Sequence, residues 1–148
     1  MVVNQRFREC SMMSDLLTYL CPFCNASLNP REYVILRGEL KGRRALMLFN
    51  PTPGDYSTII PADFPVEMND EVAFYCPVCS RDLACPQDPS MAELRFRKEG
   101  DEEEQGTVLF SRVAGRRATY FIAEGRVHSF GEHADADGVN YWGVRTTI

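Results

Sequence analysis

The chain carries one eight-residue pattern twice, as Cys21-Pro22-Phe23-Cys24-Asn25-Ala26-Ser27-Leu28 and as Cys76-Pro77-Val78-Cys79-Ser80-Arg81-Asp82-Leu83. Both copies read Cys-Pro-x-Cys-x-x-x-Leu, and an aromatic residue precedes each by two positions. We call them the first knuckle (residues 21–28) and the second knuckle (residues 76–83). A Cys-x-x-Cys turn brings two sulfurs to one metal ion, and two such turns complete a tetrahedron. The repeat therefore predicts one metal site with four ligands: Cys21, Cys24, Cys76 and Cys79.

The cysteine pairs also fit two roles that need no metal. Reduced cysteines can pack in a core as small apolar side chains. A Cys-x-x-Cys motif can also act as a dithiol redox pair, which is typical of a single motif opening a helix in an α/β chain. Two matched copies in β-type surroundings favour metal. Thiolate ligands favour zinc, with iron as the alternative.

The paired Cys-Pro-x-Cys knuckles, each entered from an expected strand, resemble the zinc ribbon (rubredoxin-like) group over residues 16–30 and 71–85. The resemblance implies a closed, structural four-thiolate site, or, with iron bound, a rubredoxin-like electron-transfer protein. The chain departs from the group in two respects. As many as 51 residues separate Cys24 from Cys76, and Asn25 and Ser80 stand where that group often has glycine.

The apolar pattern predicts a mainly β protein with little helix. Residues 14–20 could begin a short helix, but the likeness of 18–20 to 73–75 favours a strand. Two apolar runs around Lys41-Gly42 predict a hairpin, with Gly38 contributing to its turn. Beyond Pro86, alternation and short turns predict a four-stranded antiparallel meander. The expected strands are 16–20, 33–36, 45–49, 56–60, 72–74, 94–98, 107–113, 117–123 and 126–130, with residues 141–144 packing back on the sheet.

The sequence predicts three segments. Residues 1–13 form a flexible leader. Residues 14–85 form a β domain that contains the zinc ribbon, in which the insertion between the knuckles is itself folded. Residues 86–148 form the meander domain or subdomain, with the boundary at the proline-rich stretch after Cys85.

Composition and charge restrict the partners. The 148 residues carry a net charge of −5, and the parts before and after Pro86 have 8 basic against 10 acidic and 8 against 11 residues. Neither part is the basic module that nucleic-acid binding normally requires. No apolar run reaches the ~18 residues of a membrane span, and no secretory signal is evident. We therefore expect a cytoplasmic protein whose cysteines stay reduced.

Candidate chemistry elsewhere in the chain is weaker. Cys85 is either an alternative ligand or, as we favour, a buried thiol, and Cys10 is expected to be exposed. His128, Glu132 and His133 could form a second metal or hydrolytic site, although a strand histidine and a surface histidine account for the pair as well. Asp135-x-Asp137-Gly138 lacks the rest of a calcium loop.

No catalytic constellation accompanies the cysteine repeat. We expect a structural zinc-binding protein that acts as a non-enzymatic interaction or regulatory module and binds another protein. The alternatives are the iron electron-transfer protein and an enzyme that uses the His/Glu site. The sequence does not indicate a small-molecule ligand.

Overall fold

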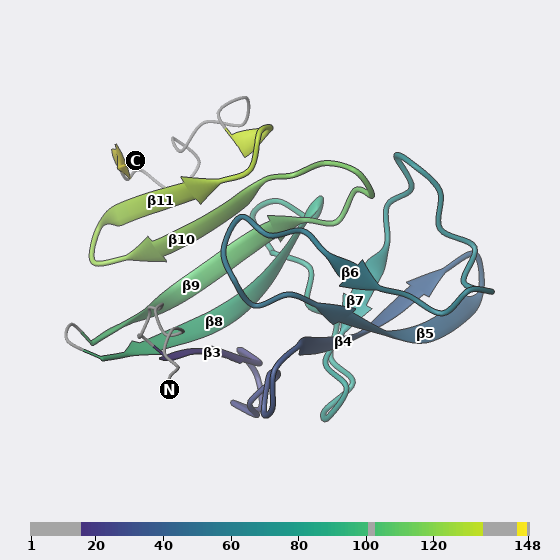
Figure 1. Ribbon diagram of the computed structural model, residues 1–148, viewed down its shortest axis with the longest axis horizontal. Helices are drawn as coiled ribbons and strands as arrows, with labels where there is room; N and C mark the ends of the chain where they lie inside the picture. Colours follow the sequence, from purple (N-terminus) through teal and green to yellow (C-terminus); the bar gives the residue numbers. More distant parts are fainter. Residues whose placement is uncertain (1–15, 101–102, 135–144, 148) are drawn as a thin grey trace, which may run out of the picture.

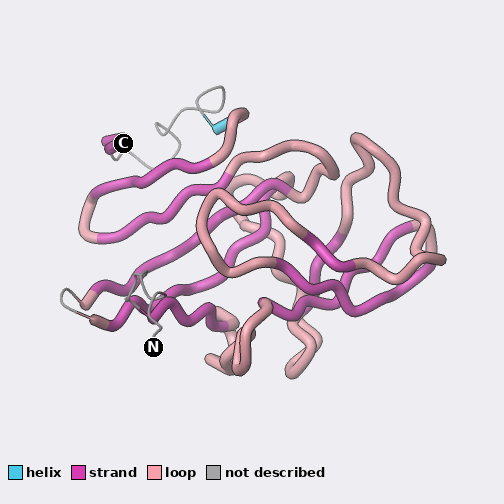
Figure 2. The backbone as a smooth tube through the Cα atoms, in the orientation of Figure 1, coloured by secondary structure: helices cyan, strands magenta, loops and turns pink. Residues whose placement is uncertain are grey.

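The computed structural model describes residues 16–100, 103–134 and 145–147, and this part of the chain is nearly all β (Figure 2). Its strands form two sheets, one of six strands and one of four (Figure 1). The expected mainly β fold class is thus confirmed. The leader 1–13, with Cys10, and residues 135–144, with Asp135, Asp137 and 141–144, lie outside the described residues.

The larger sheet has the strand order β12-β11-β10-β9-β8-β3. Its centre is the expected antiparallel meander of β8 (Met91–Glu99), β9 (Glu104–Ser111), β10 (Thr119–Ala123) and β11 (Arg126–Phe130). At one edge β3 (Leu16–Leu20) pairs antiparallel with β8, which confirms a strand before the first knuckle. At the other edge β12 (Arg145–Thr147), which the sequence did not predict, pairs parallel with β11.

The smaller sheet is antiparallel, with the order β6-β5-β4-β7. The predicted hairpin is formed by β4 (Val34–Leu40) and β5 (Arg43–Phe49), and its edges are β6 (Thr58–Ile59) and β7 (Ala73–Tyr75).

A two-residue turn closes the β4–β5 hairpin. Lys41 and Gly42 have φ angles of 54° and 76°, the backbone that matches the twist of a tight hairpin. Gly38, expected in the turn, lies instead within β4. A Cβ there would come 2.5 Å from Met47 Sδ, so the glycine admits close packing between neighbouring strands.

The inward faces of the two sheets share one hydrophobic core. In β4 buried and half-buried residues alternate over 34–38, as expected for a strand with one face on a core. Aromatic side chains join the sheets: Phe74 of β7 lies 5.6 Å from Phe49 and 5.6 Å from Phe110 of β9, measured between ring centroids. On the larger sheet, Phe96 and Phe121 stack edge to face at 5.0 Å.

The two sheets are therefore joined by packing as well as by the chain. Strand β3, from the segment expected to form the N-terminal domain, pairs with β8 of the meander. The shared core likewise contains residues from before and after the expected boundary. The division into 14–85 and 86–148 stays a prediction. Within the described residues, no helix has the length and apolar character needed to cross a membrane.

Candidate metal centre

The first knuckle follows directly from β3. Its turn is closed by a hydrogen bond from the Asn25 amide to the Cys21 carbonyl (2.9 Å), and the Cys21 amide donates to Ala26 O (3.1 Å). The Leu28 amide then donates a hydrogen bond to Tyr19 O (2.7 Å) in β3, the strand that leads into the knuckle. Asn25 has a φ of 65°, which lets the chain reverse immediately after the second cysteine.

The second knuckle follows β7 and repeats the same bonds. The Ser80 amide donates to Cys76 O (2.9 Å), and the Cys76 amide donates to Arg81 O (3.0 Å). The Leu83 amide returns to Phe74 O (2.9 Å), and Ser80 has a φ of 68°. The repeated sequence pattern thus encodes a repeated backbone structure.

The leucine that ends each repeat is also structural. Leu28 and Leu83 are both 1% exposed. The Leu28 carbonyl accepts from Ile35 N (2.8 Å) in β4, and the Leu83 carbonyl accepts from Glu93 N (2.7 Å) in β8. The first knuckle therefore passes the chain from the larger sheet to the smaller one, and the second passes it back.

The two turns bring the four predicted cysteines together. All four Sγ atoms lie within 4.8 Å of one another, and this is the group of metal-ligating side chains found in the described part of the chain. Sγ of Cys21 lies 3.7 Å from that of Cys79, and Sγ of Cys24 lies 3.8 Å from that of Cys76. A tetrahedral ion with Zn–S bonds of about 2.3 Å has sulfurs about 3.8 Å apart, so the cluster fits such an ion.

Backbone amides surround the two buried sulfurs. Sγ of Cys21 accepts from Phe23 N (3.4 Å) and Cys24 N (3.5 Å). Sγ of Cys76 accepts from the equivalent amides, those of Val78 (3.3 Å) and Cys79 (3.4 Å). Amides aimed at a sulfur favour its thiolate form, the form that binds metal.

The same sulfurs are shielded from water. Burial raises the pKa of the Cys21 thiol to about 12, against the effect of the two amides of its turn. Burial acts likewise on Cys76, but its turn amides and the adjacent Cys21 thiol outweigh burial and lower its pKa. Of the two buried thiols, Cys76 is therefore the more acidic. A bound cation would displace the thiol protons.

Burial divides the four cysteines into two kinds. Cys21 and Cys76 are fully buried, while Cys79 is half-buried and Cys24 is exposed. The second cysteine of each pair therefore lies toward the surface. Neither turn continues into a helix, whereas the dithiol redox alternative expects a helix after the motif.

Side chains outside the repeat attach each knuckle to its sheet. Asn29 Oδ1 accepts from Tyr19 N (2.8 Å) while its amide donates to Leu17 O (2.9 Å), so Asn29 bridges to β3. Sequence reasoning missed this contact. The position of Asn29 one residue after the repeated leucine is the available signal, but no equivalent asparagine follows Leu83.

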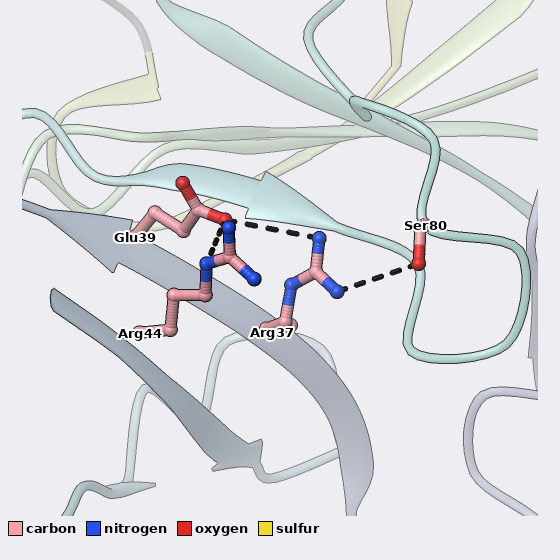
Figure 3. A network of polar contacts seen from close by, with 4 residues as sticks. All are labelled: Arg37, Glu39, Arg44 and Ser80. Carbon is pink, nitrogen blue, oxygen red and sulfur yellow. Dashed lines mark hydrogen bonds and ion pairs between the residues drawn. The ribbon is translucent and has the colours of Figure 1, made fainter. Parts of the chain in front are cut away.

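A polar network attaches the second knuckle to the β4–β5 hairpin (Figure 3). Arg37 of β4 donates to Ser80 Oγ (3.4 Å) and lies 3.7 Å from a Glu39 carboxylate oxygen, which Arg44 of β5 also pairs at 3.0 Å. The Arg37 guanidinium also lies 5.1 Å from the centroid of the Tyr75 ring. Sequence reasoning missed this network, because nothing in the chain order links β4 to Ser80.

The remaining cysteine and the histidines lie apart from this cluster. Cys85 is a buried thiol in a second apolar cluster with Met91 and Leu109, as the favoured interpretation expected, and it lies outside the four-sulfur group. The His133 side chain is anchored by a backbone amide: its Nδ1 accepts a hydrogen bond from Arg117 N (2.9 Å). His128 lies in β11, and in the described residues it does not converge with Glu132 and His133 on a metal-binding group.

Comparison with protein-family models, with curated proteins and with solved structures found no match to this chain.

Proposed function

We propose that the chain is a zinc-binding protein in which one structural ion, held by Cys21, Cys24, Cys76 and Cys79, clasps the two sheets together. The observation that carries this proposal is the pair of sulfur–sulfur distances across the knuckles, 3.7 and 3.8 Å. Each short distance joins a sulfur of one knuckle to a sulfur of the other, so an ion at the centre would link the end of β3 to the end of β7.

The chemistry of the site supports a structural role. Four thiolates fill the tetrahedron of zinc and leave no position for water or substrate. The cysteines stand where the chain crosses between the sheets, so losing the ion would release both crossings. This is the expected behaviour of a clasp, and it agrees with the non-enzymatic role that we expect for the protein in a reducing compartment such as the cytoplasm.

The knuckle tips are the surface that we propose for binding another protein. Phe23 and Val78, the variable residues of the two Cys-Pro-x-Cys turns, are 52% and 66% exposed. The Arg81 guanidinium of the second knuckle lies 5.0 Å from the Phe23 ring centroid of the first, so the tips are neighbours. Exposed aromatic, aliphatic and arginine side chains on a rigid support are typical of interface anchors.

Metal analysis of the purified chain tests the clasp. We expect one zinc per chain, four thiols that become reactive only after chelation, and loss of the metal in Cys76→Ser. Cys85→Ser is the matched control and should keep its zinc. A red, iron-containing sample would show that the site holds iron instead of zinc and would favour electron transfer. A folded chain that binds neither metal would contradict the proposal.

Exposed substitutions test the proposed interface. Phe23→Ser combined with Val78→Ser should keep the zinc content and the melting temperature of the parent but lose binding to the cellular partner, measured by quantitative capture from the source cell. Leu46→Ser with Ile59→Ser, which alters exposed apolar residues of β5 and β6, is the control and should bind normally. Equal capture by both variants would show that the tips are not the interface.

A further inference from the structure

A cavity of about 430 Å³ lies between the inward faces of the two sheets. Protein interiors are usually packed with few voids larger than a water molecule, whereas ligand pockets measure ~300–1,000 Å³. The cavity is therefore large for a packing defect and has the size of a small-molecule site. Its deep wall is apolar and includes Leu36, Met47, Leu94, Val108 and Phe121.

The cavity opens through loops at one end of the core. Exposed residues of its lining, among them Asp55, Glu67, Met68 and Arg117, belong to the β5–β6 loop, the segment before β7 and the β9–β10 turn. The β5–β6 loop is fastened across the larger sheet by Tyr56, whose hydroxyl lies 2.7 Å from Thr119 Oγ1. The mouth therefore has a fixed frame.

Cations line one side of this mouth. Arg112, Arg116 and Arg117 all belong to the lining and come from one turn. The Arg112 guanidinium is engaged by backbone carbonyls, since its Nε donates to Val72 O (2.8 Å) and its Nη1 donates to Pro89 O. Arg117 is exposed, and its guanidinium lies 5.8 Å from the ring centroid of Tyr56, another lining residue.

The acidic groups of the lining do not neutralise Arg117 by direct contact. The Ser57 side chain and the Ser57 amide, which donates to Asp55 Oδ1 (3.0 Å), hold the pKa of Asp55 below its usual range. No ion pair of Asp55 or Glu67 is found in the described part of the chain. A guanidinium at the rim of an apolar cavity is suited to one carboxylate, which it can bind through two parallel hydrogen bonds.

We propose that this cavity binds an aliphatic monocarboxylate of fatty-acid type, with its chain between the two sheets and its carboxylate on Arg117. The apolar wall would contact the aliphatic chain of the ligand, and Arg117 would bind its carboxylate. Met68, 73% exposed, lies over Gly115 at the mouth, where a Cβ would come 2.0 Å from its Sδ. Such a flexible thioether can adapt to the part of the chain nearest the head group.

Calorimetric titration of the full chain, in its metal-loaded form, tests the proposal with decanoate as the probe and decanol as its neutral match. We expect decanoate to bind more tightly than decanol. Arg117→Gln should weaken decanoate binding about tenfold, the loss of one charge-assisted contact, and leave decanol unchanged. Arg43→Gln removes an exposed charge of β5 outside the lining and should change neither.

A second pair of measurements locates the chain of the ligand. Val66→Phe adds volume to the lining and should weaken both probes. Should that variant fail to fold, nuclear Overhauser effects on the parent protein provide the test instead. They should show contacts between decanoate and the methyl groups of Val66 and Val108. Absent decanoate binding, equal affinity of the parent and Arg117→Gln for decanoate, or contacts only with exposed methyl groups would each overturn the proposal. None of these outcomes depends on which metal the clasp holds.

Discussion

Asn25 and Ser80 occupy the same position in the two knuckles and share a left-handed backbone. Their φ angles of 65° and 68° let each chain reverse and bring its amide back to the first cysteine carbonyl. Most side chains disfavour this conformation by roughly 1–2 kcal/mol, asparagine less than others and glycine least. The knuckles therefore keep some strain at these two residues, more at Ser80 than at Asn25.

Ser80 gives a direct test of that strain. We expect the free energy of unfolding to be about 1 kcal/mol higher for Ser80→Gly than for Ser80→Ala, because only glycine adopts the left-handed backbone without strain. Both variants lose the contact with Arg37, so the comparison isolates the backbone. Urea denaturation at constant zinc content measures the difference. Equal stabilities would show that Ser80 is not strained.

Cys85 differs from the four clustered cysteines because it is buried among apolar residues. Burial raises the pKa of its thiol above the ordinary value of 9.0, so the folded chain disfavours the thiolate. The stability that depends on the neutral thiol is complete below about pH 9 and is lost as the pH rises through the raised pKa.

The loss of stability at alkaline pH therefore tests whether the Cys85 thiol is kept neutral in the folded chain. Above about pH 9 the free energy of unfolding should fall more steeply for the parent than for Cys85→Ala, by at most about 1.4 kcal/mol per pH unit. Urea titrations of the metal-loaded proteins across this range provide the measurement. Parallel profiles would mean that the Cys85 thiol ionises as easily in the folded chain as in the unfolded one.

At the scale of elements, strand packing depends on glycines that adjoin other strands. In β9, a Cβ at Gly106 would lie 2.1 Å from the Ile122 carbonyl oxygen of β10. In β4, a Cβ at Gly38 would meet the Met47 thioether, which is the flexible end of a side chain. The first clash is with backbone and cannot be relieved without moving a strand.

We therefore expect Gly106→Ala to cost more than Gly38→Ala. Overpacking typically costs ~1–3 kcal/mol, and Gly106→Ala should reach or exceed the upper end because the meander must separate. Gly38→Ala should stay near the lower end, because Met47 can adopt another rotamer. Thermal unfolding of the two variants ranks them, and a reversed order would show that β9 and β10 can shift at low cost.

At the scale of the whole molecule, the four-cysteine cluster and the shared core both lie where the two sheets meet. The first knuckle leads from β3 to β4 and the second from β7 to β8, so both crossings between the sheets converge on the four sulfurs. Beyond them the inward faces share one apolar core. A metal ion bound at these crossings would restrain the sheets where the chain itself joins them.

Removal of the proposed zinc ion should therefore affect the whole protein. Structural zinc contributes about 10–16 kcal/mol in zinc-finger peptides, comparable to the ~5–15 kcal/mol by which domains are stable. We expect a chelator to unfold both sheets in one transition, followed by circular dichroism and by quenching of the tyrosines, and zinc to restore them. A meander that survives chelation with a transition of its own would contradict a shared fold and would support the two-domain division.

Local sequence was sufficient for much of the fold and for the metal-ligating candidates. A repeated Cys-Pro-x-Cys-x-x-x-Leu requires a repeated turn, and the turn pairs at Lys41-Gly42 and Glu124-Gly125 define their hairpins, because tight turns depend on residues adjacent in the chain. Strand β12 escaped prediction because three residues without alternation carry little periodic signal.

The sequence by itself determined the mainly β class, the meander and which four cysteines are candidates for one ion. Only the tertiary structure decided that the knuckles stand at the two crossings between the sheets, that Arg37 reaches Ser80, and that a cavity with Arg117 at its mouth lies in the core. Turns and strand periodicity depend on near neighbours. Distances between sulfurs 58 positions apart, and the space between two packed sheets, depend on how distant segments fit together.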